Sequence, residues 1–460
     1  LSARHLDKLC ERVDTFSVSG DGERLVVRHR DDIIVVPSSH KVDGDDPACI
    51  RVDLTRLRRT VNPRAEWRQM FDENGRLMAS HYWREDMNGV DWDGVLNRYR
   101  PLVDLCHVVD DLHDILWETV AELNTSHSYV SASGAAGDSD MRAGLLGADV
   151  SSGDDGARVV RVIPGESSDP RAWSPLRAAG VAVTEGDVIV AVDGRKVGAD
   201  GNLGELLEGS AGRVVELTVR RGENERQVAV VPMADEAPLR YHDWVASRRR
   251  YVEEHSGGRL GYLHVPDMVS DGWAELHRQI GEATRHEGVI ADVRFNHGGH
   301  TSQLVVERLA RRVVGWDYSR WYATADTYPQ NAVRGPIVMV TNQWAGSDGD
   351  IVAAATQAMG YAKVIGERSW GGVVGIDGRF DLVDGTSVTQ PRYAGWYGSY
   401  GWGVENHGVD PDIVVTVSPE DWEADRDVQL DAAIAECLRQ LDDKPAATAP
   451  ELPGPAFDRC

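Results

Sequence analysis

The sequence contains few lysines and fewer basic than acidic residues. Of its 460 residues 49 are basic, and all but five of these are arginines. Acidic residues outnumber basic ones by 74 to 49, which gives a formal charge of −25. Nucleic acids and anionic membranes are bound through basic surfaces, so we expect neither as a partner. A reaction that needs a catalytic lysine has only five candidates: Lys8, Lys41, Lys196, Lys363 and Lys444.

Cysteines and long apolar runs are also scarce. The five cysteines lie far apart and form no Cys-x-x-Cys pair, so neither a disulfide framework nor a structural zinc site is expected. No apolar run approaches the ~18 residues of a membrane-spanning helix, and the first residues lack the basic and apolar pattern of a signal peptide, so we do not expect one. His-Glu-x-x-His spacing is absent as well, and we expect no metal and no other cofactor. These absences favour a cytoplasmic protein.

The first region, residues 1–40, contains short predicted strands around a Ser-Gly-Asp-Gly turn. This pattern is typical of a β-propeller blade, but one blade cannot bury its own faces. A piece of a propeller and an ordinary hairpin on a neighbouring domain therefore both remain possible interpretations.

Residues 41–140 are predicted to be mostly helical. One long amphipathic helix is expected after Pro101, with its apolar stripe running from Leu102 to Leu123. It ends near Asn124, and a Ser/Gly/Asp-rich linker follows at 131–140.

Residues 141–236 are rich in predicted strands and resemble a PDZ domain. The resemblance rests on Ser174-Pro175-Leu176 and on the stretch from Gly186-Asp187-Val188-Ile189 to Asp193-Gly194. It implies a β-sandwich-like domain that captures a peptide by strand addition, with amides near 144–147 holding the chain terminus. A packing module that binds nothing is the alternative.

Residues 237–445 alternate strand and helix, which predicts βαβ units and a largely parallel sheet, and 446–460 are expected to be a flexible tail. In such sheets the active site lies at the carboxyl ends of the strands. The loops after Phe295 and Thr341 are therefore the places to look for chemistry. In the second loop, Ser347 lies between a strand and a helix, where the helix dipole favours an oxyanion. Serine is also a preferred helix N-cap, so a structural role is the alternative.

The loop after Phe295 contains Gly298 and Gly299, which can expose backbone N–H groups as an oxyanion hole requires. A serine nucleophile also needs a base. Tail-specific proteases use a lysine on the strand after the nucleophile helix, but Gly372 occupies that place here and Lys363 is interpreted as a solvated strand residue. Arginine stays protonated and cannot replace lysine. The base must be a histidine, and His127, His297 and His300 are the candidates.

The ordered set of motifs resembles the C-terminal half of the tricorn protease family over roughly residues 62–441. The motifs are Thr-Ser-His-Ser after a helix, the PDZ stretch, Asn-x-Gly-Gly, Ala-Gly-Ser-Asp-Gly-Asp and Gly-Val-Glu-Asn-x-Gly-Val-Asp-Pro. The resemblance implies a multidomain α+β protein. Its parts would be a β-propeller remnant, a helical cap that carries the catalytic histidine, a PDZ domain and an α/β catalytic domain of the crotonase-like, tail-specific protease type.

Transferred to matching positions, the resemblance makes Ser347 the nucleophile and His127 its general base, with Ser126 and Glu405 completing a tetrad. The oxyanion donors would be the N–H groups of Gly299 and Asp348. The short match Gly315-Trp316-Asp317 suggests that Asp317 selects basic residues.

The implied activity is that of a serine protease that cuts short peptides through an acyl-enzyme, downstream of the proteasome or similar proteases. A homohexamer is implied as its assembly. A non-catalytic peptide- or ligand-binding scaffold of the same fold is the alternative function. We expect the enzyme, because Ser347, His127 and Glu405 are all present.

Overall fold

The computed structural model describes residues 8–58, 60–133, 141–199 and 201–452. The chain divides into two compact units, Leu1–Glu66 and Trp67–Cys460. The first unit contains an antiparallel sheet whose four strands are neighbours in chain order. They are β1 (Thr15–Val18), β2 (Arg24–His29), β3 (Asp32–Pro37) and β4 (Ile50–Val52). Four antiparallel strands in this order are the content of one propeller blade.

The second unit begins inside α1 (Pro63–His81), which forms a helical region with α2 (Trp92–Val103) and α3 (Val109–Ala121). Its core contains fully buried Phe71, Met78, Leu112 and Leu116. The apolar spacing along each helix places these side chains on one face, which the neighbouring helices cover.

The prediction of one long helix after Pro101 is wrong. The chain leaves α2 after Val103 and restarts at Val109, because the Asp111 carboxylate accepts hydrogen bonds from the backbone N–H groups of His107 and Val108 and caps the new helix. Leu105, placed in the predicted apolar stripe, is 67% exposed.

The PDZ segment forms a sheet of six strands around buried Leu176, Ile189 and Leu217. Five follow the order β11-β10-β8-β7-β6, and β9 pairs with β8. A 3-10 turn, η4 (Pro175–Arg177), and α4 (Leu203–Leu206) complete this domain. The strands are β6 (Ala148–Gly153), β7 (Gly156–Val162), β8 (Val188–Val192), β9 (Arg195–Lys196), β10 (Val215–Arg221) and β11 (Asn224–Val230).

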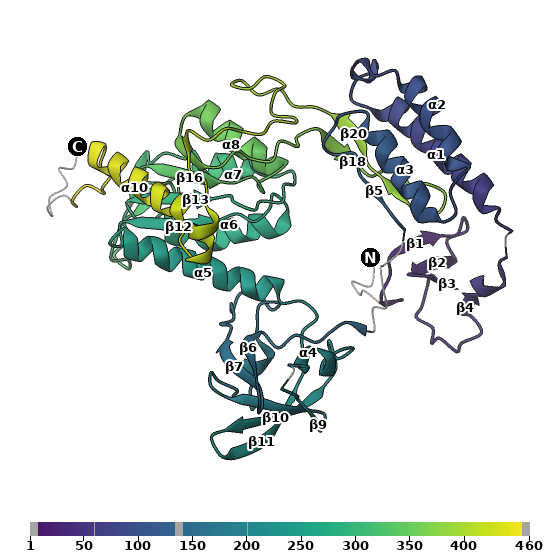
Figure 1. Ribbon diagram of the computed structural model, residues 1–460, viewed down its shortest axis with the longest axis horizontal. Helices are drawn as coiled ribbons and strands as arrows, with labels where there is room; N and C mark the ends of the chain where they lie inside the picture. Colours follow the sequence, from purple (N-terminus) through teal and green to yellow (C-terminus); the bar gives the residue numbers. More distant parts are fainter. Residues whose placement is uncertain (1–7, 59, 134–140, 200, 453–460) are drawn as a thin grey trace. The chain divides into compact units, whose positions relative to one another are not determined.

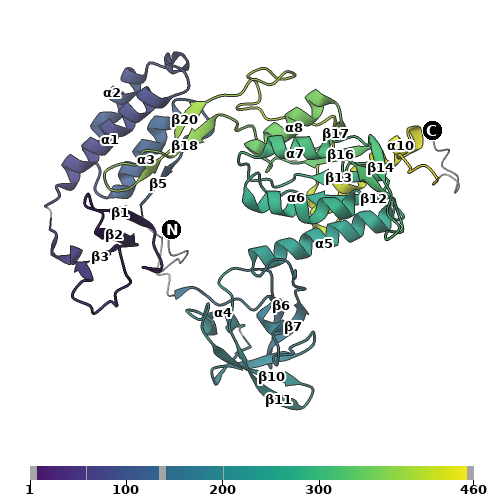
Figure 2. The same ribbon diagram turned by 180° about the vertical axis from the view of Figure 1, so that it is seen from behind.

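The catalytic segment is built on a parallel sheet of order β12-β13-β16-β17-β21. Helices α6, α7 and α8 cover one face, and α5 and α10 cover the other (Figure 1 and Figure 2). Burial on both faces explains why β12, β13 and β16 contain no exposed residue. The strands are β12 (Leu260–His264), β13 (Gly288–Asp292), β16 (Ile337–Thr341), β17 (Ala362–Gly366) and β21 (Ile413–Val414), and the helices are α5 (Ala237–His255), α6 (Ser270–Ala283), α7 (Ser302–Leu309), α8 (Asp348–Met359) and α10 (Val428–Asp443).

An arm between β17 and β21 leaves this sheet and reaches the helical region. In it, β18 (Gly375–Asp377) pairs with β20 (Gln390–Tyr393), and β19 (Ser387–Val388) pairs with β5 (Val130–Ser131). Val388 is fully buried in the helical core. The segment that carries His127 is therefore held by strands of the catalytic segment.

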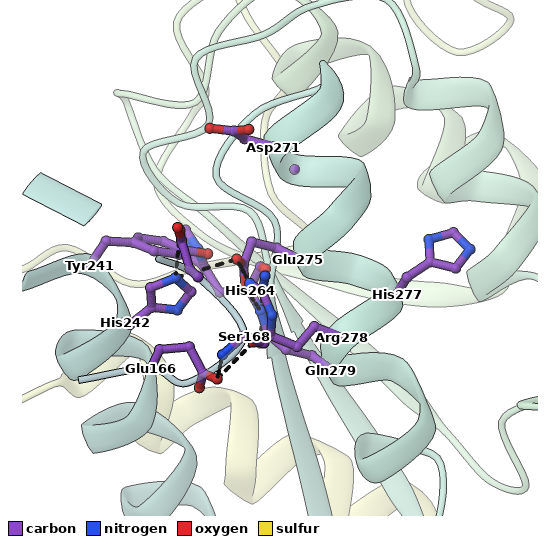
Figure 3. Close-up of polar contacts among 12 residues, drawn as sticks. Glu166, Ser168, Tyr241, His242, His264, Asp271, Glu275, His277, Arg278 and Gln279 are labelled. Atoms are coloured by element: carbon purple, nitrogen blue, oxygen red, sulfur yellow. Dashed lines mark hydrogen bonds and ion pairs between the residues drawn. The ribbon is translucent and has the colours of Figure 1, made fainter. Parts of the chain in front are cut away.

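A buried polar cluster joins the PDZ domain to α5 and α6. His242 of α5 lies 3.3 Å from Asp169 of the PDZ domain and 3.7 Å from Glu275 of α6, measured from Nε2 to the carboxylate oxygens. Figure 3 shows His242 and Tyr241 next to Glu275. Arg171 also binds both Asp169 and Asp271, and Asp271 lies in the first turn of α6. The PDZ domain is thus fixed to the helix that follows β12.

Candidate active site

Ser347 lies between the carboxyl end of β16 and the first residue of α8. Its backbone has φ 58° and ψ −120°, a conformation that non-glycine residues adopt only under constraint. Its side chain makes no capping hydrogen bond to α8. Ser347 therefore occupies the N-cap position of α8 without capping it through its side chain, and no described residue is hydrogen-bonded to its hydroxyl.

The glycine loop lies directly against this serine, because β13 and β16 are parallel neighbours. A Cβ atom built on Gly298 would lie 2.5 Å from the Cβ of Ser347 and 3.1 Å from its Oγ. Gly298 has φ +75°, so glycine is required there for space and for conformation. The two loops that follow the strands meet at Ser347, as the parallel topology predicts.

Two backbone N–H groups beside Ser347 are available. Within the described ranges, the N–H groups of Gly299 and Asp348 donate to no protein acceptor. The Asp348 carboxylate accepts a 3.0 Å hydrogen bond from the Ser302 N–H at the start of α7, and burial raises the pKa of this carboxyl. The Asp348 side chain therefore links the first residues of α8 and α7.

Ser126, His127 and Glu405 are brought together from segments almost 280 residues apart. The Oγ of Ser126 lies 3.1 Å from Nδ1 of His127 and 3.1 Å from Oε2 of Glu405. The Ser126 N–H donates to Oε1 of Glu405 at 2.8 Å. A chain of polar contacts thus leads from the carboxylate through the hydroxyl to the imidazole.

His127 is 7% exposed and is packed between two aromatic rings. The rings of Tyr129 and Trp370 meet it edge-on, with centroid distances of 5.8 and 5.5 Å. Burial lowers the pKa of His127, an effect that outweighs the opposing influence of the Glu405 charge and of a hydrogen bond with the Val374 backbone. The imidazole is therefore neutral at pH 7, as a general base must be.

Trp370 links the histidine to the nucleophile turn. A Cβ atom on Gly346 would lie 2.6 Å from its indole ring, which shows that the ring rests on the residue before Ser347. The indole is 47% exposed. Across the part of the chain that the structure covers, no hydrogen bond joins Ser347 Oγ to His127. Such bonds are often long in unliganded enzymes and tighten when substrate binds.

The other candidate residues have exposed side chains, and two of them, His297 and His300, flank the glycine loop itself. His297 and His300 are exposed, and Lys363 is an exposed residue of β17 that pairs with Asp412. Asp317 is exposed on β14 (Gly315–Asp317) and faces Asp326 on β15 (Asp326–Tyr328). Its role in selecting substrates stays a prediction.

Sequence reasoning missed Asp350, Ser369 and Trp370. Asp350 is fully buried on α8 and accepts hydrogen bonds from Ser369 Oγ and from the Gly371 N–H. Only the second acidic residue in Ser-Asp-Gly-Asp hinted at it. Among the described residues no group of three or more His, Cys, Asp or Glu side chains is arranged to hold a metal ion.

Three family models match the chain. They are the tricorn protease C1 domain at residues 63–121, the tricorn protease PDZ domain at 144–235 and peptidase family S41 at 259–415. No helix in the described ranges combines the length and apolar character needed to cross a membrane.

Relatives resemble nearly the whole chain. Tricorn protease homolog 1 of Streptomyces coelicolor is 57% identical over 98% of this chain and 43% of its own length. The tricorn protease of Thermoplasma acidophilum is 35% identical over 96% of this chain and 41% of its own. A crystal structure of the tricorn protease superposes with a TM-score of 0.88 at 34% identity, covering 96% of this chain and 43% of that one.

The chain spans less than half the length of these relatives. The matched domains coincide in order with the helical region, the PDZ domain and the parallel-sheet segment of the structure, and the multidomain α+β fold is confirmed. The chain is a homologue of the C-terminal part of the tricorn proteases, with C1, PDZ and S41 peptidase domains in that order.

Proposed function

We propose that the chain is the catalytic part of a serine peptidase that cleaves short peptides through an acyl-enzyme on Ser347. The observation that carries this proposal is the constrained, uncapped serine held against the glycine loop. Strain of this kind is retained where function requires it. The match to peptidase family S41 supports the same reaction class.

In the proposed mechanism, His127 takes the Ser347 proton as the hydroxyl attacks the peptide carbonyl. Ser126 contacts Nδ1, which leaves Nε2 as the atom that receives the proton. Glu405 orients Ser126 and stabilises the imidazolium that forms. His127 then gives the proton to the leaving amine, and water releases the acyl group by the reverse sequence of transfers.

The tetrahedral intermediate carries a negative oxygen that needs hydrogen-bond donors. We assign this role to the N–H groups of Gly299 and Asp348, which donate to no acceptor in the described part of the chain. Each donor of this type contributes about 10²–10³ in turnover. Because Asp348 lies in the first turn of α8, the positive end of the helix dipole also stabilises the negative oxygen.

The proposed substrates are oligopeptides with a basic residue before the cut, selected by Asp317. We further propose a cytosolic enzyme that acts downstream of the proteasome or similar proteases, and a homohexameric assembly. The four described cysteines are unpaired, which fits a reducing compartment.

A peptidase assay on the purified chain tests this function. Cleavage of a short Arg-containing peptide should be abolished in Ser347→Ala. Asp317→Asn should slow cleavage after Arg or Lys more than after Leu, because it removes the charge that pairs with a basic side chain. A chain that binds such peptides without cleaving them, in its oligomeric form, would favour the non-catalytic scaffold.

A further inference from the structure

Four consecutive backbone N–H groups, those of residues 371–374, donate to two carboxylates that belong to different halves of the site. Gly371 and Gly372 donate to Asp350, with N–O distances of 2.8 and 3.3 Å. Val373 and Val374 donate to Oε2 of Glu405, at 2.8 and 3.0 Å. Asp350 lies on α8, three residues after Ser347, whereas Glu405 holds the histidine through Ser126.

Asp350 is also tied to the loop that carries Glu405. Its carboxylate accepts a hydrogen bond from the Ser369 hydroxyl. The hydroxyl oxygen of Ser369 in turn accepts a hydrogen bond from the Val409 N–H at 2.9 Å. The backbone of Gly371 in turn accepts the Asn406 N–H at 2.7 Å. The segment 369–374 is therefore pinned between α8 and the loop at 404–409.

We propose that Asp350 is a positioning residue, whose carboxylate holds the segment 369–374 against the nucleophile turn and so sets the placement of His127 relative to Ser347. The Trp370 indole, resting on Gly346 and meeting the His127 ring, is seated by the same anchor. The inference rests on the proposed function, since this placement matters only if Ser347 attacks a substrate.

The charge state of Asp350 supports a functional role over a stabilising one. Burial raises the pKa of Asp350 to about 6, although hydrogen bonds from Ser369 and backbone amides oppose the shift. A folded pKa above the unfolded value of ~3.9 means that the ionised carboxylate reduces stability at pH 7. Oδ1 accepts from Ser369 Oγ and the Gly371 N–H, whereas Oδ2 can accept from the Gly372 N–H only when the carboxyl is ionised, because a proton on Oδ2 would point at that N–H group.

No lysine or arginine among the described residues forms an ion pair with Asp350. Its carboxylate oxygens accept hydrogen bonds from neutral donors, the Ser369 hydroxyl and the N–H groups of Gly371 and Gly372. The titratable groups that face it or the segment it holds are Asp348 on the same helix, Tyr397, and Glu405 and His127 beyond the segment.

The variant Asp350→Asn tests the inference through a pH profile. It should lower kcat roughly 10²-fold with little change in KM, since a displaced reacting group has about that effect. In the unmodified protein two groups must lose protons below pH 7, so log kcat/KM should fall with a slope approaching about 2 in acid. In Asp350→Asn only His127 remains, and the slope should be about 1. A merely structural role would leave the slope unchanged.

Asp187→Asn is the matched control. Asp187 is a 1% exposed carboxylate of the PDZ domain that accepts from the Thr184 N–H and from Arg221, so its loss removes the hydrogen bonds of a buried carboxylate, and an ion pair as well, away from the site. The control should keep the kcat and slope of the unmodified protein. If Asp350→Asn does not fold, Ser369→Ala decides, with an expected fall in kcat of about 10-fold for one lost bond to a charged group.

The outcomes separate the inference from the proposed function. Fluorophosphonate labelling of Ser347 in the unmodified protein, with full kcat and an unchanged slope in Asp350→Asn, overturns the inference and leaves the peptidase intact. Full kcat in Ser369→Ala, where Asp350→Asn is unfolded, overturns it as well. An absence of labelling in the unmodified protein overturns the proposed function and the inference with it.

Discussion

Ser347 combines a left-handed backbone conformation with a hydroxyl that caps nothing. Conformations of this kind require support from the surrounding structure. The support comes from Gly298, which lies against the serine Cβ, and from the turn into α8. Its place between strand and helix made Ser347 a candidate with a helix cap as the alternative, and only the family resemblance suggested a nucleophile. The backbone angles that decide against a cap exist only in the folded loop.

Gly298→Ala is predicted to abolish activity. The added Cβ would collide with the Ser347 side chain and would also occupy a strained φ of +75°. We expect kcat/KM to fall by more than about 10², because the nucleophile is displaced. Gly180→Ala is the control, since Gly180 has φ +84° but no atom within 4 Å of the new Cβ. Equal activity in both variants would show that the added Cβ at position 298 does not displace Ser347, and would contradict this prediction.

The acid limb of the pH profile should include the step of a histidine with a lowered pKa, in addition to the Asp350 step inferred above. Because burial lowers the pKa of His127, its neutral form persists below ~6.5, the value of an exposed histidine. Cleavage should therefore remain unchanged as pH falls to ~6.5 and decline only below it, which steady-state rates between pH 4.5 and 8 would measure. An inflection above 6.5, or a flat profile, would argue against His127 as the base.

The pairing of strands β5 and β19 explains how His127 is brought close to Ser347, although the two residues lie far apart in the sequence. Thr389, just after β19, accepts the Tyr129 N–H at 2.7 Å and donates to the His127 carbonyl at 2.8 Å. Such pairing could not be read from the sequence, because β5 and β19 are two-residue strands without a periodic pattern. The helix break at Asp104 was missed for a related reason. The helical spacing of apolar residues continues across the break in the sequence. The break is set by the Asp111 side chain, which caps the start of the next helix.

Thr389→Val is predicted to loosen the histidine segment. It removes the hydroxyl and leaves the Tyr129 N–H and the His127 carbonyl unpaired, which should lower the free energy of unfolding by about 1–3 kcal/mol. Activity should fall roughly 10-fold or more through misplacement of the imidazole. Thr389→Ser keeps the hydroxyl and serves as the control. Chemical denaturation and steady-state kinetics on both variants measure the effects, and a Val variant equal to the Ser variant would refute this anchor.

At the scale of the whole molecule, the site is assembled from parts that lie far apart in the chain. The segment that follows the C1 region contributes Ser126 and His127, and the S41 segment contributes Ser347, the glycine loop and Glu405. Buried strands with short connections made the parallel sheet predictable. The segment 371–374 was not predictable, because its function lies in backbone N–H groups that any residue except proline supplies.

The central claim is that Ser347 is an activated nucleophile with His127 as its base, and active-site labelling tests it most directly. The purified protein would be treated with a fluorophosphonate near pH 8, and peptide mass spectrometry would locate the adduct. The account predicts a single adduct on Ser347, lost in Ser347→Ala and formed much more slowly in His127→Ala. No adduct on Ser347, or labelling that is as fast without His127, would contradict it.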